Sequence, residues 1–437
     1  MSVMSSVLLA GTGPASVQLA VLFKTRMHCR IAIAGRESVR SEPFFTALRQ
    51  SGGHIRAEVQ NELHRPLAGE CFVDHVFQGY GNVTGEWDAV VLAVTTDAYI
   101  EVLKQIETDI LKRAKCVVLI SPTFGSSSLV RHYMNEIGSD AEIVSFSTYL
   151  GDTRWLRGEP SWSVVTTGVK RKVFVGSTRA ASEALSMIRE LYGQLGIALE
   201  VMSAPLEAET RNISLYVHPP LFMNEFALNA IFGSTPGKAY VYKLFPEGPI
   251  TPSLIRGMLA SWKEMTGVVE ALGLQGVNLL KFMTDDNYPV RPESLPRPEI
   301  ERFTQLEPIH QQYLLYVRYA SLLIDPFSAP DDEGRYFDFS AVPIRRIFVN
   351  KEGKWDIPRM PKEDYYRIKI VRGIAAFLGI ASPTLDSYIA LYERALEEAS
   401  RTLAGQPLSE AFTAQSFEEE LNMICREIEA SSHEARS

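Results

Sequence analysis

The chain has 437 residues, of which 46% are hydrophobic and 22% charged, and its formal net charge is -8. This composition is typical of a globular protein with two domains, and the acidic balance argues against a nucleic-acid-binding protein. No apolar run reaches the ~18 residues of a membrane span, and the N-terminus lacks the basic region of a signal peptide. We therefore expect a cytoplasmic protein with no membrane partner.

The four cysteines, Cys29, Cys71, Cys116 and Cys425, form no C-x-x-C pair. Scattered cysteines of this kind fit free thiols in a reducing compartment. No histidine or cysteine pair has the spacing of metal ligands, so we expect the protein to hold no metal.

Strand and helix patterns alternate through the first ~150 residues. Apolar runs typical of strands begin with "SVLLA", "CRIAIAG" and "WDAVVLAVTT", and helical spacing follows in "PASVQLAVLFKTR" and "DAYIEVLKQIETDILKRA". Such alternation predicts a parallel sheet with helices on both faces. Further along, "SVVTTGVKRKVFVGS" has the pattern of a hairpin with its turn near Lys170.

Residues 1–205 are therefore predicted to form a Rossmann-like dinucleotide-binding domain. Residues 206–437 are predicted to form a mostly helical domain, because four long segments in it carry apolar residues at three- and four-residue spacing. Proline-rich breaks separate these segments. The predicted fold class is α/β, with the Rossmann-like domain followed by the helical domain.

The turn after the first strand reads Gly11-x-Gly13-x-x-Ser16. In a strand–turn–helix context the first glycine permits the tight turn, the second lets backbone approach a pyrophosphate, and a small third residue allows close helix packing. The helix N-terminus then holds the phosphates. We expect dinucleotide binding here; the alternative is a structural glycine turn.

The end of the second strand indicates which dinucleotide binds. NAD sites place an acidic residue there to hold the ribose 2′-OH, whereas this chain has Gly35-Arg36, with Arg40 a turn later. A guanidinium suits the 2′-phosphate of NADP, so we expect NADPH. Glu37 leaves NAD open as an alternative. The predicted cofactor contacts are Gly11, Thr12, Gly13, Pro14, Ala15, Ser16, Arg36 and Arg40.

His218 is the candidate general acid/base. It lies in "RNISLYVHPPLFMNEFALNAIF", where the helical domain begins, and Pro219 and Pro220 fix the backbone after it. Histidine titrates near working pH, and we expect His218 to face the interdomain cleft. A core histidine beside a helix start is the alternative.

Three features together resemble the opine dehydrogenases: the N-terminal glycine turn, the N-x-x-x-x-x-H-P segment, and the late "EDYYRIKIVRGIAAFLGIASPTLDSYIALYE". The resemblance spans nearly the whole chain, although only these short motifs are specific. It implies a catalytic His–Asp pair at His218 and Asp364. The other motif positions are Tyr366, Gly379, Pro383 and Asp386.

The stretches "SFSTYLGDTRW", "VHPPLFMNEFAL" and "YASLLIDPFS" resemble the branch of that family that makes opine metallophores, the staphylopine-, pseudopaline- and yersinopine-type dehydrogenases. The resemblance implies NADPH, a 2-oxo acid such as pyruvate or 2-oxoglutarate, and a histidine–aminobutyrate amine. It also implies substrate binding by Asp152, for which a turn residue is the alternative. We expect small-molecule substrates, no nucleic acid, and a homodimer.

Several alternatives stay open. Asp325 competes with Asp364 for the role of the acid, and Arg154, Arg157 and Arg318 are candidates for binding substrate carboxylates. The function could instead be that of an NADP-dependent 2-hydroxyacid or 6-phosphogluconate-type dehydrogenase, which needs no amine. A non-enzymatic NADP-sensing regulator would need no histidine at the cleft.

Overall fold

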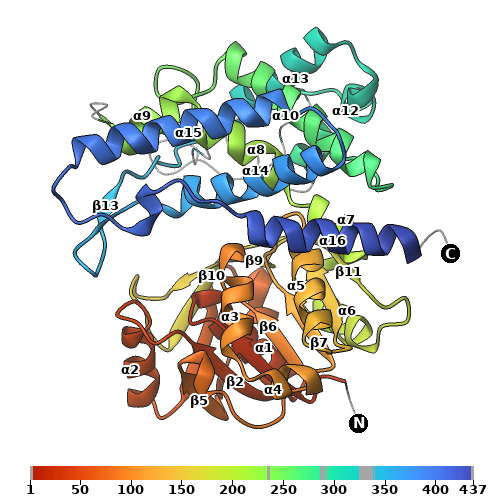
Figure 1. Cartoon of the computed structure of the whole chain (residues 1–437), viewed down its shortest axis with the longest axis vertical. Coiled ribbons are helices and arrows are strands. Elements are labelled where there is room, and N and C mark those ends of the chain that lie inside the picture. The colour runs from red at the N-terminus through yellow and green to blue at the C-terminus, as the bar shows by residue number, and fades with distance from the viewer. Residues whose placement is uncertain are drawn as a thin grey trace. The chain divides into compact units, whose positions relative to one another are not determined.

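The computed structural model describes residues 3–233, 237–285, 290, 293–323, 338 and 340–434. The chain divides into two compact units, one of Met1–Arg211 with Glu419–Ser437 and one of Asn212–Glu418. The predicted class is confirmed: the first unit is built on a largely parallel sheet, and the second is largely helical (Figure 1).

The main sheet of the first unit has eight strands, and neighbours run parallel except that β11 is antiparallel to β8. In spatial order the strands are β12 (Ala198–Val201), β11 (Lys172–Ser177), β8 (Glu142–Phe146), β7 (Cys116–Leu119), β6 (Ala89–Leu92), β1 (Ser6–Ala10), β2 (Arg30–Gly35) and β5 (His75–Gln78). Strand β1 has β2 on one side and β6 on the other. From β1 the chain continues to β2 on one side of the sheet and later returns to add β6 on the other side, so the strand order reverses at β1. Open α/β sheets bind ligands at such a switch point, beyond the carboxyl ends of the strands.

A second sheet of four strands belongs to the same unit. Its order is β4 (Gly69–Phe72), β3 (His54–Val59), β10 (Ser163–Val169) and β9 (Gly151–Trp155). The predicted hairpin over 163–177 is wrong: both strands form, but β10 pairs with β3 and β9, whereas β11 pairs with β8 and β12. The local pattern identified the strands, but their partners are distant in sequence, and each strand buries its apolar side chains with those partners.

Helix α1 (Pro14–Arg26) contacts strands of both sheets and is buried from Ser16 to Phe23. A helix that is buried on all sides is expected to be apolar around its whole circumference. The buried stretch "VQLAVLF" meets this expectation at every position except Gln18. Its one amide, Gln18, is satisfied: it donates to the carbonyl of Leu67 at 2.8 Å and accepts from the Thr166 hydroxyl at 2.9 Å. The other helices of this unit are α2 (Glu42–Gln50), α3 (Tyr99–Gln105), α4 (Thr108–Arg113), α5 (Ser126–Glu136), α6 (Glu183–Gln194), α7 (Pro205–Thr210) and α16 (Glu418–Glu434).

The C-terminal helix α16 falls in the first unit, whereas the boundary drawn from sequence at 205/206 assigned it to the helical domain. Ion pairs hold it to α3 and α5: Lys104 binds Glu419 at 2.9 Å, and Arg131 binds the buried Glu427 at 3.0 Å. These contacts join residues about 300 positions apart, which no local pattern indicates.

The second unit is a helical bundle with one short hairpin, β13 (Phe348–Val349) and β14 (Trp355–Asp356). Its helices are α8 (Ile213–Phe222), α9 (Glu225–Phe232), α10 (Pro252–Ala271), α11 (Leu279–Asp285), α12 (Arg297–Glu301), α13 (Pro308–Ala320), α14 (Arg359–Phe377) and α15 (Pro383–Thr402). Helix α8 packs against both α10 and α14. Short 3-10 helices lie at Glu62–Leu67, Tyr80–Asn82 and Thr96–Ala98 in the first unit and at Phe303–Gln305, Ser321–Leu323 and Glu410–Phe412 in the second.

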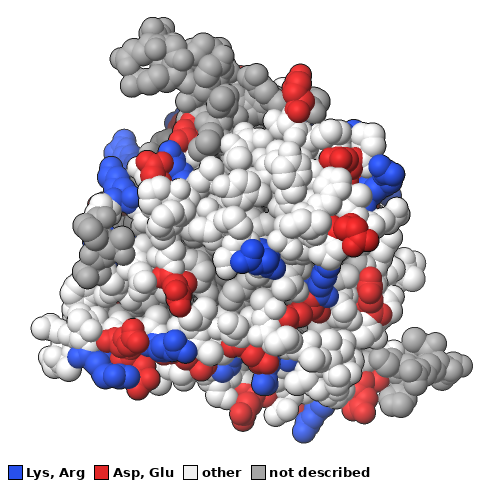
Figure 2. Space-filling view, turned by 90° about the horizontal axis from the view of Figure 1, so that it is seen from above, with Lys and Arg blue, Asp and Glu red and all other residues white. Residues whose placement is uncertain are grey.

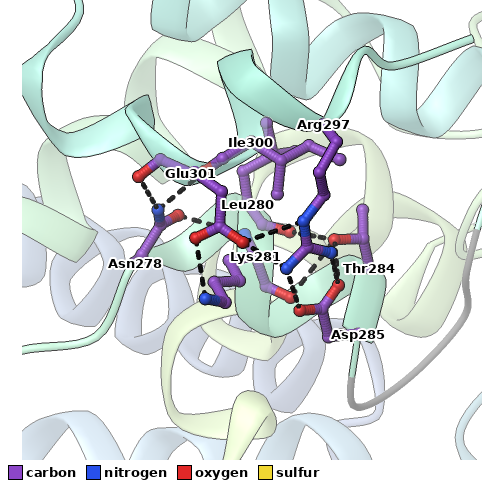
Figure 3. Close-up of polar contacts among 8 residues, drawn as sticks. All are labelled: Asn278, Leu280, Lys281, Thr284, Asp285, Arg297, Ile300 and Glu301. Carbon is purple, nitrogen blue, oxygen red and sulfur yellow. Dashed lines mark hydrogen bonds and ion pairs between the residues drawn. The ribbon is translucent and has the colours of Figure 1, made fainter. Parts of the chain in front are cut away.

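A network of charged side chains joins α11 to α12 (Figure 3). Arg297 donates to both carboxylate oxygens of Asp285, at 2.7 and 3.0 Å, and also to Glu301, which accepts from Lys281 at 2.7 Å. The two carboxylates raise the pKa of Arg297. Arg297 is 54% exposed and Glu301 42%, so solvent screens the network, which fixes geometry more than it adds stability.

Figure 2 shows acidic and basic side chains interspersed on the face it presents, with no extended patch of one sign. A nucleic-acid-binding face would gather lysine and arginine. Within the described ranges, none of the helices combines the length and the apolar character needed to cross a membrane.

Candidate active site

The turn after β1 has the geometry that a pyrophosphate site requires. Gly11 has a φ of +134°, and a Cβ there would lie 2.5 Å from the carbonyl oxygen of Ala93, so only glycine fits. Gly13, the residue before α1, is the opposite case, because an added Cβ would meet no protein atom within 4 Å. The space beside Gly13 is therefore open to a ligand that approaches the backbone closely.

Two further features make this turn suitable for an anion. No side chain caps the N-terminus of α1, and its first turn contains no acidic residue. No carboxylate therefore competes with a bound anion for the positive end of the helix dipole. Ser16 is fully buried, and its hydroxyl has no hydrogen-bond partner among the residues described. An unsatisfied buried hydroxyl beside a glycine turn fits a site completed by a polar ligand.

The end of β2 lies against this turn. A Cβ on Gly35 would lie 2.2 Å from the Thr12 methyl group, so the two segments approach closely. Arg36 follows and pairs with Glu101 of α3 at 3.1 Å, with both side chains more than half exposed. An exposed pair of this kind contributes little, so the guanidinium can exchange Glu101 for a phosphate at low cost. Arg40 is also exposed.

In the second unit, the structure brings His218 and Asp364 together from 146 positions apart. His218 lies on α8 and Asp364 on α14, and the Nδ1 to Oδ1 distance is 3.6 Å. This is an ion-pair distance, longer than the 2.6–3.2 Å of a formed hydrogen bond. Asp364 is fully buried and the His218 side chain is 21% exposed, so the imidazole is the member of the pair that solvent and small molecules can reach.

The surroundings of His218 decide which ring nitrogen carries its proton. Besides Asp364, Nδ1 has the sulfur of Met360 at 3.2 Å. A carboxylate oxygen and a thioether sulfur are both acceptors, so Nδ1 is the donor. In the neutral ring Nε2 then holds the lone pair that can take a proton from a substrate.

Helix α8 holds the imidazole in place. The Asn212 side chain caps the helix by accepting from the N–H of Ser214 at 3.0 Å, and Pro219 and Pro220 follow the histidine. The His218 ring stacks edge-on against Phe222, with centroids 5.4 Å apart. A ring fixed on three sides loses little freedom when it transfers a proton.

Asp364 has a second partner that the motifs did not single out. Arg367, one helical turn later, donates from Nη1 to the same Oδ1 that faces His218. Its side chain is only 8% exposed. The D-x-x-R spacing in "EDYYRIKIV" places both residues on one face of a helix, so this signal was present in the sequence.

The other predicted residues are placed as follows. Asp152 lies on β9, exposed, where it binds Arg154 and accepts from the Thr167 hydroxyl at 3.0 Å. Arg157 is exposed, whereas Arg318 is buried with its guanidinium 4.9 Å from the Tyr319 ring centroid. The rival acid, Asp325, lies outside the described residues. Within those residues, no group of three or more histidine, cysteine, aspartate or glutamate side chains is placed to hold a metal.

Sequence reasoning missed a buried acid in the first unit, Glu209 on α7. Its carboxylate accepts from the N–H of Gly125 at 2.9 Å, the N–H of Ser127 at 2.7 Å and the hydroxyl of Ser145 at 2.8 Å. Burial raises its pKa to about 7, against the lowering effect of these hydrogen bonds. Glu209 thereby fills the N-terminus of α5, and nothing in "PLEAETRN" indicates so distant a partner.

Comparison with known proteins shows the family to which this chain belongs. The family model for staphylopine dehydrogenase matches residues 5–428. The chain is 46% identical to the staphylopine synthase of Staphylococcus aureus over 428 residues, covering 98% of this chain and 99% of that protein. It is 36% identical to the pseudopaline synthase of Pseudomonas aeruginosa, covering 90% of each.

A solved structure agrees with the fold. The yersinopine dehydrogenase structure with NADP⁺ bound matches with a TM-score of 0.91 and 27% identity, covering 98% of this chain and 100% of that one. The similarity therefore includes both units and the segments that join them.

Proposed function

The chain belongs to the staphylopine dehydrogenase family, and from this premise we propose that it catalyses the NADPH-dependent reductive condensation of a 2-oxo acid with a primary amine. Family membership makes it an opine dehydrogenase, as the motifs indicated. The observation that carries the chemistry is the His218–Asp364 pair, a partly accessible imidazole (21% exposed) backed by a fully buried carboxylate.

The substrates proposed are pyruvate or 2-oxoglutarate and a histidine–aminobutyrate amine, which would give an opine-type metallophore. The amine attacks the keto carbon, the resulting carbinolamine loses water to form an imine, and reduction of the imine gives a secondary amine. When bound, NADPH supplies the hydride for that reduction. The glycine turn from Gly11 to Ser16 would hold its pyrophosphate, and Arg36 with Arg40 would hold the 2′-phosphate.

His218 would perform the proton transfers. Neutral Nε2 takes a proton from the amine substrate as its nitrogen adds to the keto carbon, and the imidazolium returns one to the departing hydroxyl, so the ring alternates between its neutral and charged forms. Asp364 keeps Nδ1–H oriented and stabilises the imidazolium that forms. Asp152 would pair with the ammonium group of the amine. A homodimer and a cytoplasmic location stay predictions.

The amine requirement tests this function. NADPH oxidation, followed by absorbance, should be seen only when both the 2-oxo acid and the amine are present, and mass spectrometry should find the secondary amine. Each substrate alone is the control. If the 2-oxo acid alone is reduced to a hydroxy acid at a comparable rate, the chain is a simple 2-hydroxyacid dehydrogenase instead.

The cofactor site has its own test in Gly13→Ala. The new methyl group meets no protein atom within 4 Å, so the free energy of unfolding should hardly change, while NADPH should bind more weakly because the methyl occupies the space at the backbone. An unchanged NADPH affinity in Gly13→Ala would show that the pyrophosphate binds elsewhere.

The site proposed for the 2′-phosphate has a separate test. Arg36→Ala should reduce the preference for NADPH over NADH.

A further inference from the structure

Arg367 binds the acid of the proposed catalytic pair on the atom that faces the histidine. Its Nη1 donates to Oδ1 of Asp364, and the same Oδ1 lies 3.6 Å from Nδ1 of His218. Both contacts therefore converge on one oxygen. If the carboxylate plane tilted away from this orientation, both contacts would lengthen together.

This arrangement differs from a structural arginine–carboxylate pair. In such a pair the guanidinium forks onto both oxygens, as Arg297 does onto Asp285 (Figure 3). Here Oδ2 of Asp364 and Nε of Arg367 are buried and have no hydrogen-bond partner within the part of the chain that the structure describes. Arg367 thus fixes only the oxygen that is presented to His218.

Burial gives the contact its strength. Asp364 is fully buried and the Arg367 side chain is 8% exposed, so solvent does little to screen the pair. A guanidinium stays charged at any working pH, and it supplies compensating charge for a carboxylate that water cannot reach. Without it, Asp364 would be an unpaired buried acid beside a neutral imidazole.

We propose that Arg367 is a positioning residue of the reaction: it holds the Asp364 carboxylate with Oδ1 toward His218 Nδ1 and so fixes the imidazole for proton transfer. This inference rests on the proposed acid–base role of His218 and Asp364. Because its side chain is only 8% exposed, Arg367 would act through the carboxylate and not by direct contact with substrate or cofactor. Its effect should therefore appear in kcat and vanish when the carboxylate is absent.

The test is a double-mutant cycle of Arg367→Met and Asp364→Asn. Arg367→Met should lower kcat by ~10–100-fold, the range typical when a partner that orients a reacting group is lost. In the Asp364→Asn background the same change should lower kcat less than about twofold, because the two residues act as one unit. KM for both substrates and the Kd for NADPH should change little. Equal losses in both backgrounds, or a raised oxo-acid KM with unchanged kcat, would show that Arg367 acts directly on substrate and would overturn the proposal.

Two further variants guard against a folding explanation. Arg367→Lys keeps a buried cation within reach of Oδ1 and should recover at least tenfold of the rate lost in Arg367→Met. Arg372→Met is the control for loss of an arginine from the same helix. Arg372 pairs with Asp386 at 2.9 Å, and both side chains are about half exposed, so this variant should keep kcat unchanged. If Arg367→Met does not fold, the double variant, which removes both buried charges, should fold and turn over like Asp364→Asn. A double variant markedly slower than Asp364→Asn counts against the proposal.

Failure here is distinguishable from failure of the proposed function. If His218→Asn and Asp364→Asn keep full activity, the acid–base pair is wrong and the role of Arg367 falls with it. If they are slow while Arg367→Met turns over normally, the pair stands and only the positioning role is overturned.

Discussion

Each unit of this protein buries a carboxyl group completely, and the two are held in opposite ways. Glu209, in the first unit, is surrounded by neutral donors, the backbone N–H groups of Gly125 and Ser127 and the hydroxyls of Ser127 and Ser145. Asp364, in the second unit, is bound by the guanidinium of Arg367 and faces the ring of His218. Neutral donors solvate a charge only in part, whereas a cation compensates it.

The consequence for Glu209 is visible in its pKa, which burial raises to about 7. A third acid shows what a cation does: Asp356 is 3% exposed and bound by Lys362, and although burial acts to raise its pKa, the lysine and the other hydrogen bonds lower it to about 2. The difference teaches that burial alone does not assign a role. Glu209 joins α7 to α5 and β8 through these hydrogen bonds, whereas Asp364 lies 3.6 Å from the ring of His218, for which we propose a catalytic role.

The largest expected effect separates rate from stability. Asp364→Asn and His218→Asn should each lower kcat by ~10²–10⁴-fold, the usual contribution of acid–base catalysis, while NADPH binds normally. Glu209→Gln should keep kcat within about twofold. Steady-state kinetics on folded enzyme, with NADPH titrations beside them, measure both. A fast Asp364→Asn, or a slow Glu209→Gln, would break the contrast between the two acids.

The next effect concerns pH. Because the folded-state pKa of Glu209 is raised from 4.5 to about 7, the folded protein holds this proton more tightly than the unfolded chain. Stability from this group is therefore complete below pH ~4.5 and is lost as pH rises to ~7, by about 3 kcal/mol. Urea unfolding of the native protein and of Glu209→Gln across this range should give free energies whose difference shifts by that amount in favour of the amide. Parallel curves would show that Glu209 titrates normally.

A smaller effect is expected from Ser145→Ala. The Ser145 hydroxyl donates to Glu209 at 2.8 Å, and a buried hydrogen bond to a charged group contributes about 1.5–3 kcal/mol. The loss should be larger at pH 8, where Glu209 is ionised, than at pH 5, and the pKa of Glu209 should rise further. Unfolding at the two pH values measures it. Ser186→Ala is the control, because that exposed hydroxyl donates to the backbone carbonyl of Ser182, the N-cap residue of α6, and not to an acid.

The smallest effect tests the exposed network of Figure 3. Arg297→Gln removes several ion pairs, yet they are half exposed and screened, so the midpoint of unfolding should move little at low salt and not at all in 1 M salt. Thermal unfolding at the two salt concentrations is the measurement. A large shift that persists in 1 M salt would contradict the conclusion that solvent and salt screen these exposed charges.

The sequence by itself determined the features that depend on neighbouring residues. The glycine turn, the alternation of strands and helices, and the long helices α10, α13, α14 and α15 follow from short-range spacing, and the structure has them. Gly11 adopts the positive φ that its place after β1 requires. The short motifs were also sufficient to identify the family.

Only the tertiary structure decided which distant groups meet. It separated β10 and β11 into different sheets, returned α16 to the first unit, and placed Met360 and Arg367 around the His218–Asp364 pair. It also brought Glu209 to the start of α5. The physical reason is common to all of them: spacing along the chain fixes dihedral preference and the apolar face of an element, whereas the partner of a buried strand, helix or charge is chosen by packing and desolvation among segments far apart in sequence.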